Sequence, residues 1–399
     1  MRDVLDAPYL DLGDERFSVG SEEVMRVREL SWFARTNYGL AVLRYEEVSE
    51  LLKDRRLHQG SAAWPAHNGV TDGTFVDWWS DSLLNREGEE HARLRRLLSP
   101  AFSPAVIKPL LPRFHALASE LVDAFPPDGR CEFMSAFATP YAARVTTILL
   151  GLPEGEWEEI ARHASTLGLA LGLRLNEELP RVEAALEALF AYADRTIAER
   201  RHEPRDDFAT RLVQATEDAE RLTDRELRDS IVLLIFGGVD TTRNQLGLGV
   251  RTFLDHPDQW ELLARRPELA SSAVDEVMRL RPTVTWITRE AAEDFEFRGL
   301  RIERGTTLHL LSQAAATDPR AFGDDATEFD IAGERPRHFG FGRGIHHCLG
   351  HFVARSDMAE ALPLLAKRLT ALRLDGEAQY LPPSGNTGPV RLPLAFDAR

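Results

Sequence analysis

The stretch Phe341-Gly342-Arg343-Gly344-Ile345-His346-His347-Cys348-Leu349-Gly350 decides how this chain is interpreted. Its three glycines let the backbone turn sharply and approach a flat partner closely, because glycine has no Cβ. Such a loop can present Cys348 as a thiolate, which is a strong metal ligand. A lone cysteine is more commonly a small buried core residue, so the order and spacing of the surrounding residues must decide between the two interpretations.

The spacing favours the interpretation of Cys348 as a metal ligand. The ten residues match, without a gap, the pattern Phe-Gly-x-Gly-x-His-x-Cys-x-Gly. With six fixed positions at roughly 5% usage each, the odds of a chance match anywhere in the chain are on the order of 10⁻⁵. The chain therefore resembles the soluble bacterial members of the cytochrome P450 superfamily, in which this cysteine is an axial ligand of haem iron. The resemblance implies a mainly α fold with small β-sheets, a long central helix over a haem b, and cofactor contacts from Phe341, Gly342, His346, Cys348 and Gly350.

The amino-acid composition limits the classes of protein to which the chain can belong. The 399 residues are 43% hydrophobic and 28% charged, which is typical of a soluble globular chain with a large core. The 48 basic and 64 acidic residues give a net charge of −16, which argues against a general nucleic-acid binder. Cys131 and Cys348 are the only cysteines, so a disulfide framework is not expected and the chain fits a reducing compartment. We interpret Cys131 as a core residue.

The N-terminal residues 1–8 lack an apolar run of signal-peptide length, and charges break every later apolar stretch. The sequence therefore predicts a cytoplasmic protein without a membrane anchor. For such a protein the resemblance implies electrons from NAD(P)H that arrive through a ferredoxin reductase and a ferredoxin.

A helical stretch, 91–98, carries His91 and Arg95 four residues apart and so on one helix face. Two donors on one face suit two carboxylates, although such a pair taken alone is more often a solvated surface. The resemblance implies that they hold the haem propionates. It implies the same for Arg289, at the end of an expected strand over 284–288, and for His346.

A second organising element begins at Thr223, which forms a capping-box pattern with Glu226. Apolar residues at helical spacing extend the predicted helix to about Leu254, a rod of roughly 45 Å. In its middle stands the stretch Gly237-Gly238-Val239-Asp240-Thr241-Thr242. Two interior glycines cost on the order of 1 kcal/mol each relative to alanine.

Two readings explain that cost. The glycines could mark a packing point where two elements touch, or an opening at which an acid and a hydroxyl pass protons into an apolar cavity. The resemblance favours the second. It implies that Gly237 contacts the cofactor and that Asp240 and Thr241 are catalytic residues that deliver protons to dioxygen.

Glu276 and Arg279 are three residues apart on a further predicted helix. Alone they are an ordinary surface ion pair worth little. The resemblance implies a structural pair locked to a third group near the Cys348 loop. Arg335 and His338 are both candidates for that group, because the spacing there departs from the family's form.

The segment 58–85 is rich in Gly, Ala and aromatic residues and is predicted to be a long functional loop. The resemblance implies that this loop covers the substrate pocket. Five aromatic side chains are candidate pocket residues and suggest an apolar, aromatic ligand, although core packing needs the same residue types. They are Trp64, Trp78, Trp79, Phe236 and Trp286.

The remaining pattern predicts a single domain over residues 1–399. It favours a strand over 38–45, a helix over 46–53, strands at 295–297 and 307–311, and a terminal hairpin over 382–389. Residues 114–201 are predicted to be mostly helical with breaks near Pro126-Pro127, Pro153 and Pro180. A last helix, 352–369, is expected to bend or end at Pro363.

The function implied by the resemblance is a haem-thiolate monooxygenase that hydroxylates or otherwise oxidises a small, largely apolar organic substrate in secondary metabolism. The alternative is an atypical haem-thiolate oxidase that performs oxidative coupling, peroxide-driven oxidation or oxidation of a substrate bound to a carrier protein. A non-catalytic haem-binding module is a third hypothesis, against which the complete Asp240-Thr241 motif argues.

Overall fold

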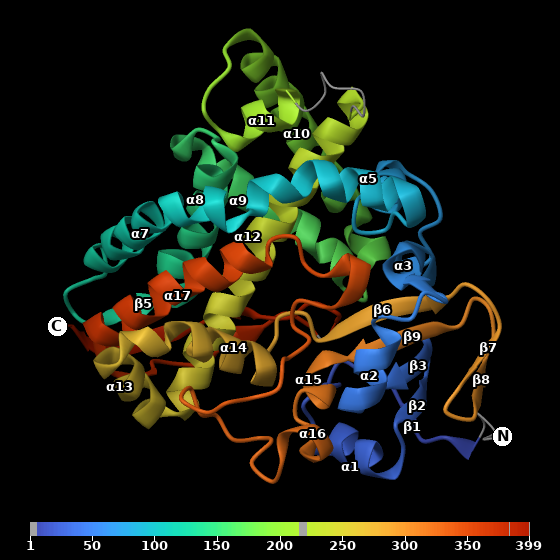
Figure 1. Cartoon of the computed structure of the whole chain (residues 1–399). Coiled ribbons are helices and arrows are strands. Elements are labelled where there is room, and N and C mark those ends of the chain that lie inside the picture. The colour runs from blue at the N-terminus through green and yellow to red at the C-terminus, as the bar shows by residue number, and fades with distance from the viewer. Residues whose placement is uncertain (1–5, 215–221, 383, 399) are drawn as a thin grey trace.

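The computed structural model describes residues 6–382 and 384–398, except 215–221. Helices fill most of the molecule, and the larger sheet lies on one side of it, near the N-terminus (Figure 1). The helices are α1 (Glu22–Leu30), α2 (Tyr45–Leu51), α3 (Trp64–His67), α4 (Thr74–Asp81), α5 (Gly88–Leu98), α6 (Pro104–Ile107), α7 (Leu111–Asp123), α8 (Thr139–Leu150), α9 (Trp157–Gly168), α10 (Leu175–His202), α11 (Phe208–Gln214), α12 (Asp224–Asp255), α13 (Pro257–Arg265), α14 (Ala270–Leu280), α15 (Ser312–Ala315), α16 (Pro319–Phe322) and α17 (His351–Arg368). The mainly α fold with small sheets is confirmed.

The strands form one larger sheet and three small ones. Their bounds are β1 (Tyr9–Leu10), β2 (Phe33–Thr36), β3 (Gly39–Val42), β4 (Leu57–Gln59), β5 (Arg130–Glu132), β6 (Trp286–Ala291), β7 (Phe295–Phe297), β8 (Leu300–Ile302), β9 (Thr307–Leu311), β10 (Leu369–Leu374), β11 (Gln379–Tyr380), β12 (Pro389–Arg391) and β13 (Pro393–Ala398). The larger sheet has the order β1-β2-β3-β9-β6-β4. Strands β6 and β9 pair antiparallel, with Thr288 opposite His309.

Helix α12 is the centre of the fold (Figure 1). The predicted capping box is present, because the Thr223 side chain accepts from the Glu226 backbone and the Glu226 side chain accepts from the Thr223 backbone. The 32 residues that follow are continuous helix, a length of about 48 Å. Helices α8, α9, α10, α14 and α17 pack around α12 and form the main hydrophobic core with it. The prediction of a long central helix is therefore confirmed.

Two predictions are wrong, the long loop over 58–85 and the break near Pro180, and the last helix does not end at Pro363. The segment 58–85 contains α3 and α4, because Phe75, Trp78 and Trp79 recur at helical spacing and are all buried. Pro180 lies inside α10 and Pro363 lies inside α17. An interior proline costs a helix about 3 kcal/mol. In α17 the buried Leu362, Leu365 and Ala366 hold the helix in place across that defect.

Other predictions on this part of the chain are confirmed. The hairpin of β7 and β8 turns at residues 298–299, and β9 has the predicted bounds. The terminal hairpin is built by β11 and β12, although Pro383, within the predicted range, lies outside the described residues. Residues 1–5 of the N-terminal stretch 1–8 also lie outside the described residues. Among the residues that the structure describes, no helix is long and apolar enough to cross a membrane.

Candidate functional site

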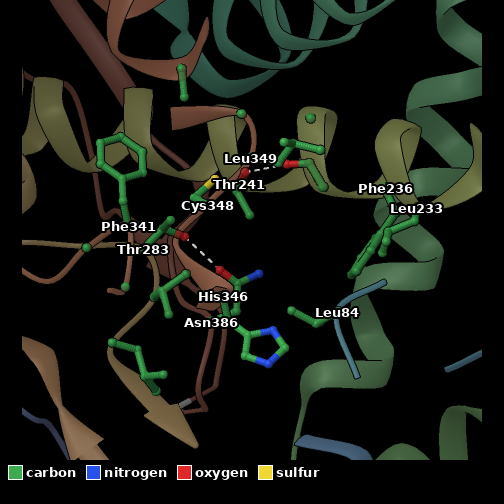
Figure 2. Close-up of a pocket in the computed structure, with 18 of the residues that line it drawn as sticks. Leu84, Leu233, Phe236, Thr241, Thr283, Phe341, His346, Cys348, Leu349 and Asn386 are labelled. Atoms are coloured by element: carbon green, nitrogen blue, oxygen red, sulfur yellow. Dashed lines mark hydrogen bonds between the residues drawn. The ribbon is translucent and has the colours of Figure 1, made fainter. Parts of the chain in front are cut away.

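A cavity of about 440 Å³ lies between the Cys348 loop, the middle of α12, the start of β6 and the turn at residues 385–386. Figure 2 shows Cys348 and Thr241 close to one side of it and the apolar side chains of Leu84, Leu233 and Phe236 on the other. The lining is mostly apolar, with a few polar groups among it. Such a cavity is typical of a small-molecule site.

The loop around Cys348 turns on its glycines. Gly342 and Gly344 have φ angles of 65° and 74°, a region that favours glycine. A Cβ on Gly344 would lie only 2.6 Å from the Leu52 carbonyl oxygen. The Cys348 N–H donates to the Phe341 carbonyl at 2.9 Å, which closes the loop. The glycine turns and this hydrogen bond therefore hold the Cys348 thiol in place.

The Cys348 thiol faces the cavity but is enclosed by protein beyond it. This burial raises the pKa of the Cys348 thiol, while the Gly350 N–H and the Arg95 guanidinium act in the opposite direction. A thiol in such surroundings becomes a thiolate when a metal cation coordinates it. The sulfur is thus suited to a cationic partner in the cavity.

Four basic side chains lie on one side of the loop. The rings of His91 and His346 have centroids 4.4 Å apart, and His346 Nε2 lies 2.9 Å from a Glu87 oxygen. Arg95 donates to the His347 carbonyl. Arg289 donates to the side chain of Gln59 and to the Thr288 carbonyl. All four predicted propionate residues line the same cavity: His91, Arg95, Arg289 and His346.

One of these four groups has an unpaired nitrogen: within the described part of the chain, His91 Nε2 is buried without a hydrogen-bond partner. Burial, assisted by His346 and Arg95, lowers the pKa of His91 to about 4. Burial also lowers the pKa of Arg289 to about 10, against the favourable effect of Glu87. The buried Arg289 guanidinium needs an anionic partner, and the neutral His91 ring can donate a hydrogen bond, so the set fits the carboxylates of a flat dianionic ligand. The residues present therefore fit a haem with its two propionates.

The two glycines of α12 differ in their surroundings. A Cβ on Gly237 would meet no atom within 4 Å, and Gly237 lines the cavity. A Cβ on Gly238 would lie 2.8 Å from Thr146 Oγ1 of α8. Gly237 thus leaves room for a ligand, and Gly238 allows the two helices to pack closely. The packing interpretation therefore applies to Gly238, and the proton-delivery interpretation stays a prediction.

Thr241 presents its hydroxyl at the cavity surface and donates to the Gly237 carbonyl at 2.5 Å (Figure 2). Asp240 lies behind the wall and is 2% exposed. One Asp240 oxygen accepts from Arg243 Nη2 at 2.8 Å, and the other accepts from Asn386 Nδ2 at 2.7 Å. Burial raises the pKa of the Asp240 carboxyl, and Arg243 and Asn386 partly oppose this.

Sequence reasoning missed Asn386, which joins Asp240 to the cavity. Its Oδ1 accepts from the Thr283 hydroxyl at 2.7 Å, and both residues line the cavity (Figure 2). An asparagine between glycines in a terminal hairpin has the signature of a turn residue. The pattern alone contained no signal for this contact, which joins residues far apart in the sequence.

The Glu276 and Arg279 side chains form a buried bidentate pair, with N–O distances of 2.7 and 2.8 Å. Arg279 also donates to the carbonyls of Ala316, Ala326 and Glu328. Of the two candidates for a third partner, Arg335 lies next to Glu276, with 3.7 Å between Arg335 Nε and Glu276 Oε1. His338 Nε2 instead lies 3.8 Å from Asp275.

Of the five aromatic pocket candidates, Trp64, Trp79, Phe236 and Trp286 line the cavity. The prediction is wrong for Trp78. Trp78 is fully buried behind the wall, where its ring contacts Phe236 and its indole N–H lies 3.4 Å from the Asp229 carbonyl. On α4, Phe75, Trp78 and Trp79 pack together, and only Trp79 reaches the cavity.

The comparison with protein families agrees with this geometry. Residues 173–265 and 255–383 match the family described as cytochrome P450. The chain belongs to the cytochrome P450 family. It is 38% identical to the luteothin monooxygenase of Streptomyces thioluteus over 98% of this chain and 97% of that protein. It is 33% identical to the mycinamicin IV hydroxylase/epoxidase of Micromonospora griseorubida, over 94% of this chain and 93% of that protein.

Solved cytochrome P450 structures share the whole architecture. The structure of CalO2 superposes with a TM-score of 0.87 at 30% identity and covers 95% of this chain and 98% of that one. P450BioI in complex with a fatty acid ligated acyl carrier protein superposes with a TM-score of 0.86 at 27% identity and covers 94% and 97%. The chain is thus a cytochrome P450 monooxygenase with relatives in natural-product biosynthesis.

Proposed function

We propose that this cytochrome P450 is one domain over residues 1–399 that hydroxylates or otherwise oxidises a small, largely apolar molecule of secondary metabolism. Its electrons come from NAD(P)H through a ferredoxin reductase and a ferredoxin. The observation that carries the proposal is that one mostly apolar cavity is lined by Cys348, four basic side chains and Thr241, and that His91 Nε2 has no partner among the described residues.

The haem would be held from two sides. Cys348 supplies the iron ligand, and Phe341, Gly342, Gly350 and Gly237 leave room for the flat macrocycle. The carboxylates are bound by His91, Arg95, Arg289 and His346. When bound, haem supplies the activation of dioxygen.

Proton handling falls to Asp240 and Thr241. Because burial raises its pKa, Asp240 holds a proton more readily near neutral pH than an ordinary aspartate does. Thr241 presents a hydroxyl that can accept a proton from the protein side and donate one into the cavity. Asn386 keeps one Asp240 oxygen next to the cavity wall. The apolar lining excludes water, which protects the reaction from unproductive proton transfer.

A second candidate function is an atypical oxidation such as oxidative coupling. The cytochrome P450 enzyme CxnD, whose structure is described as forming a C–S bond, superposes with a TM-score of 0.85 at 29% identity over 98% of this chain. The complex of P450BioI with its acyl carrier protein supports a carrier-bound substrate for either function.

An oxygen-labelling experiment distinguishes the monooxygenase reaction from oxidative coupling. Compounds are first screened, free and attached to a carrier protein, for the Soret shift that accompanies water displacement. The best ligand is then turned over under ¹⁸O₂ with a surrogate ferredoxin system and NADPH. A monooxygenase places one labelled atom in the product. A product without label supports the coupling reaction and contradicts the proposal.

A further inference from the structure

His309 is a polar residue in the apolar wall of the cavity. It is the central residue of β9, where its neighbours Leu308 and Leu310 are fully buried. Its own side chain is 1% exposed and lines the cavity. Because side chains alternate along a strand, His309 shares its face of the sheet with its cross-strand neighbour Thr288, which also lines the cavity.

Among the residues that the structure describes, neither ring nitrogen of His309 has a hydrogen-bond partner. Its ring neighbours are Trp286, with centroids 5.8 Å apart, and Tyr38, with centroids 6.4 Å apart. These rings offer flat surfaces and no bond to the imidazole. An unpaired buried polar group costs about 1–3 kcal/mol, and native proteins leave few of them. The partner must therefore come from the cavity.

The imidazole is neutral at physiological pH. Burial, assisted by the charge of His67, lowers the pKa of His309 to about 4. A neutral imidazole has one nitrogen that donates and one that accepts. It can therefore bind a hydroxyl, a carbonyl or an amide. It has no charge with which to offset the desolvation of a carboxylate.

We propose that His309 is a specificity-determining residue, which hydrogen-bonds a neutral polar group, such as an amide, carbonyl or hydroxyl, on an otherwise apolar substrate. The aromatic ring of Trp286, which lines the cavity beside His309, favours a flat group at that end of the substrate. This inference rests on the proposed function, because it names the substrate class of the same cavity.

Calorimetric titration of the purified holoenzyme with decanamide and decanoate at pH 7.5 tests the proposal. The two probes share size and shape and differ in charge. We expect decanamide to bind about tenfold tighter, the effect of one hydrogen bond. His309→Leu should lower the affinity for decanamide by about tenfold and leave the affinity for decanoate within about twofold of the wild-type value. His309→Gln, which keeps a donor and an acceptor, should restore most of the amide affinity.

His115→Leu is the control, because His115 is a surface histidine on α7, 3.2 Å from Glu360, that does not line the cavity. It should leave both affinities within about twofold. Equal affinity of the wild-type protein for both probes, or an equal loss of both in His309→Leu, would overturn the proposal. Calorimetry does not depend on the iron. A holoenzyme without thiolate ligation would refute the proposed function and still report on His309.

Discussion

The molecule contains two buried carboxylates that each pair with an arginine three residues later on a helix. The two pairs differ in the number of hydrogen bonds that join them and in the other groups that they bind. Glu276 and Arg279 are 3% and 1% exposed and meet through two hydrogen bonds. The other donors of Arg279 go to backbone carbonyls of a distant segment. That pair therefore ties α14 to the chain that leads to the Cys348 loop.

Asp240 and Arg243 meet through a single hydrogen bond, and Arg243 also donates to Ser165 and Asn244. The second oxygen of Asp240 is bound by asparagine amides, which carry no charge. When Asp240 is protonated, Arg243 keeps its hydrogen bonds to the neutral side chains of Ser165 and Asn244. The comparison shows that full pairing fixes a structure, whereas partial pairing leaves an acid available for proton transfer.

The largest effect is expected for Glu276→Gln. It leaves Arg279 buried without a counter-charge, so the free energy of unfolding should fall by about 3–5 kcal/mol. Urea denaturation measures the change. Glu120→Gln is the control, because Glu120 makes a similar bidentate pair with Arg144 at the surface. It should cost less than about 1 kcal/mol. An equal loss in both variants would remove the distinction between the pairs.

Asp240→Asn should lower turnover by about 10²-fold, because it removes a proton carrier, and should raise the solvent isotope effect. Stability should change by only about 1 kcal/mol, since Arg243 keeps Ser165 and Asn244. The control is Asp229→Asn on the same helix, where burial also raises the pKa of the carboxyl. Asp229 lines a different cavity. A similar loss of turnover in the control would contradict the role of Asp240.

Thr241→Ala should divert electrons from NADPH into hydrogen peroxide and lower product formation about tenfold, the effect of one lost hydrogen bond in the transition state. The ratio of product to peroxide measures it. Thr252→Ala is the matched control, because the Thr252 hydroxyl also donates to a carbonyl four residues earlier on α12, at 2.8 Å. Thr252 is buried away from the cavity. Unchanged coupling in Thr241→Ala would remove its proposed role.

The smallest effect concerns pH. Because the pKa of Asp240 is raised in the folded state, the folded chain binds more protons than the unfolded chain at pH values between the ordinary pKa of 3.8 and the raised one. This contribution to stability therefore grows as the pH falls through that window and is lost as the pH rises. The wild type should gain stability relative to Asp240→Asn on acidification, by less than about 1.4 kcal/mol per pH unit. The opposite slope in urea titrations would contradict the raised pKa.

The sequence predicted the elements that local chemistry determines. The glycines and the cysteine of 341–350 specify a loop, and Thr223 and Glu226 specify a helix start, because each signal lies within ten residues. The break expected near Pro180 was wrong, and α17 continues through Pro363, because packing outweighs a local defect.

The remaining site residues depend on contacts that sequence spacing does not encode. His309 in a strand of leucines looks like a core residue until the register of β6 and β9 places it on the cavity face. Asn386 meets Asp240 across 146 residues. Arg335 meets Glu276 only because the chain before the Cys348 loop folds back on α14.

Thiolate ligation is the central claim, and the absorption spectrum of the reduced, carbon monoxide-treated holoenzyme tests it most directly. A thiolate-type Soret band is predicted for the wild type, and its loss is predicted in Cys348→His. The matched Cys131→Ser should keep the band, because burial raises the pKa of the Cys131 thiol to about 12 and Cys131 lies away from the cavity. A wild-type spectrum without the thiolate band would contradict the assignment of Cys348 and the function proposed from it.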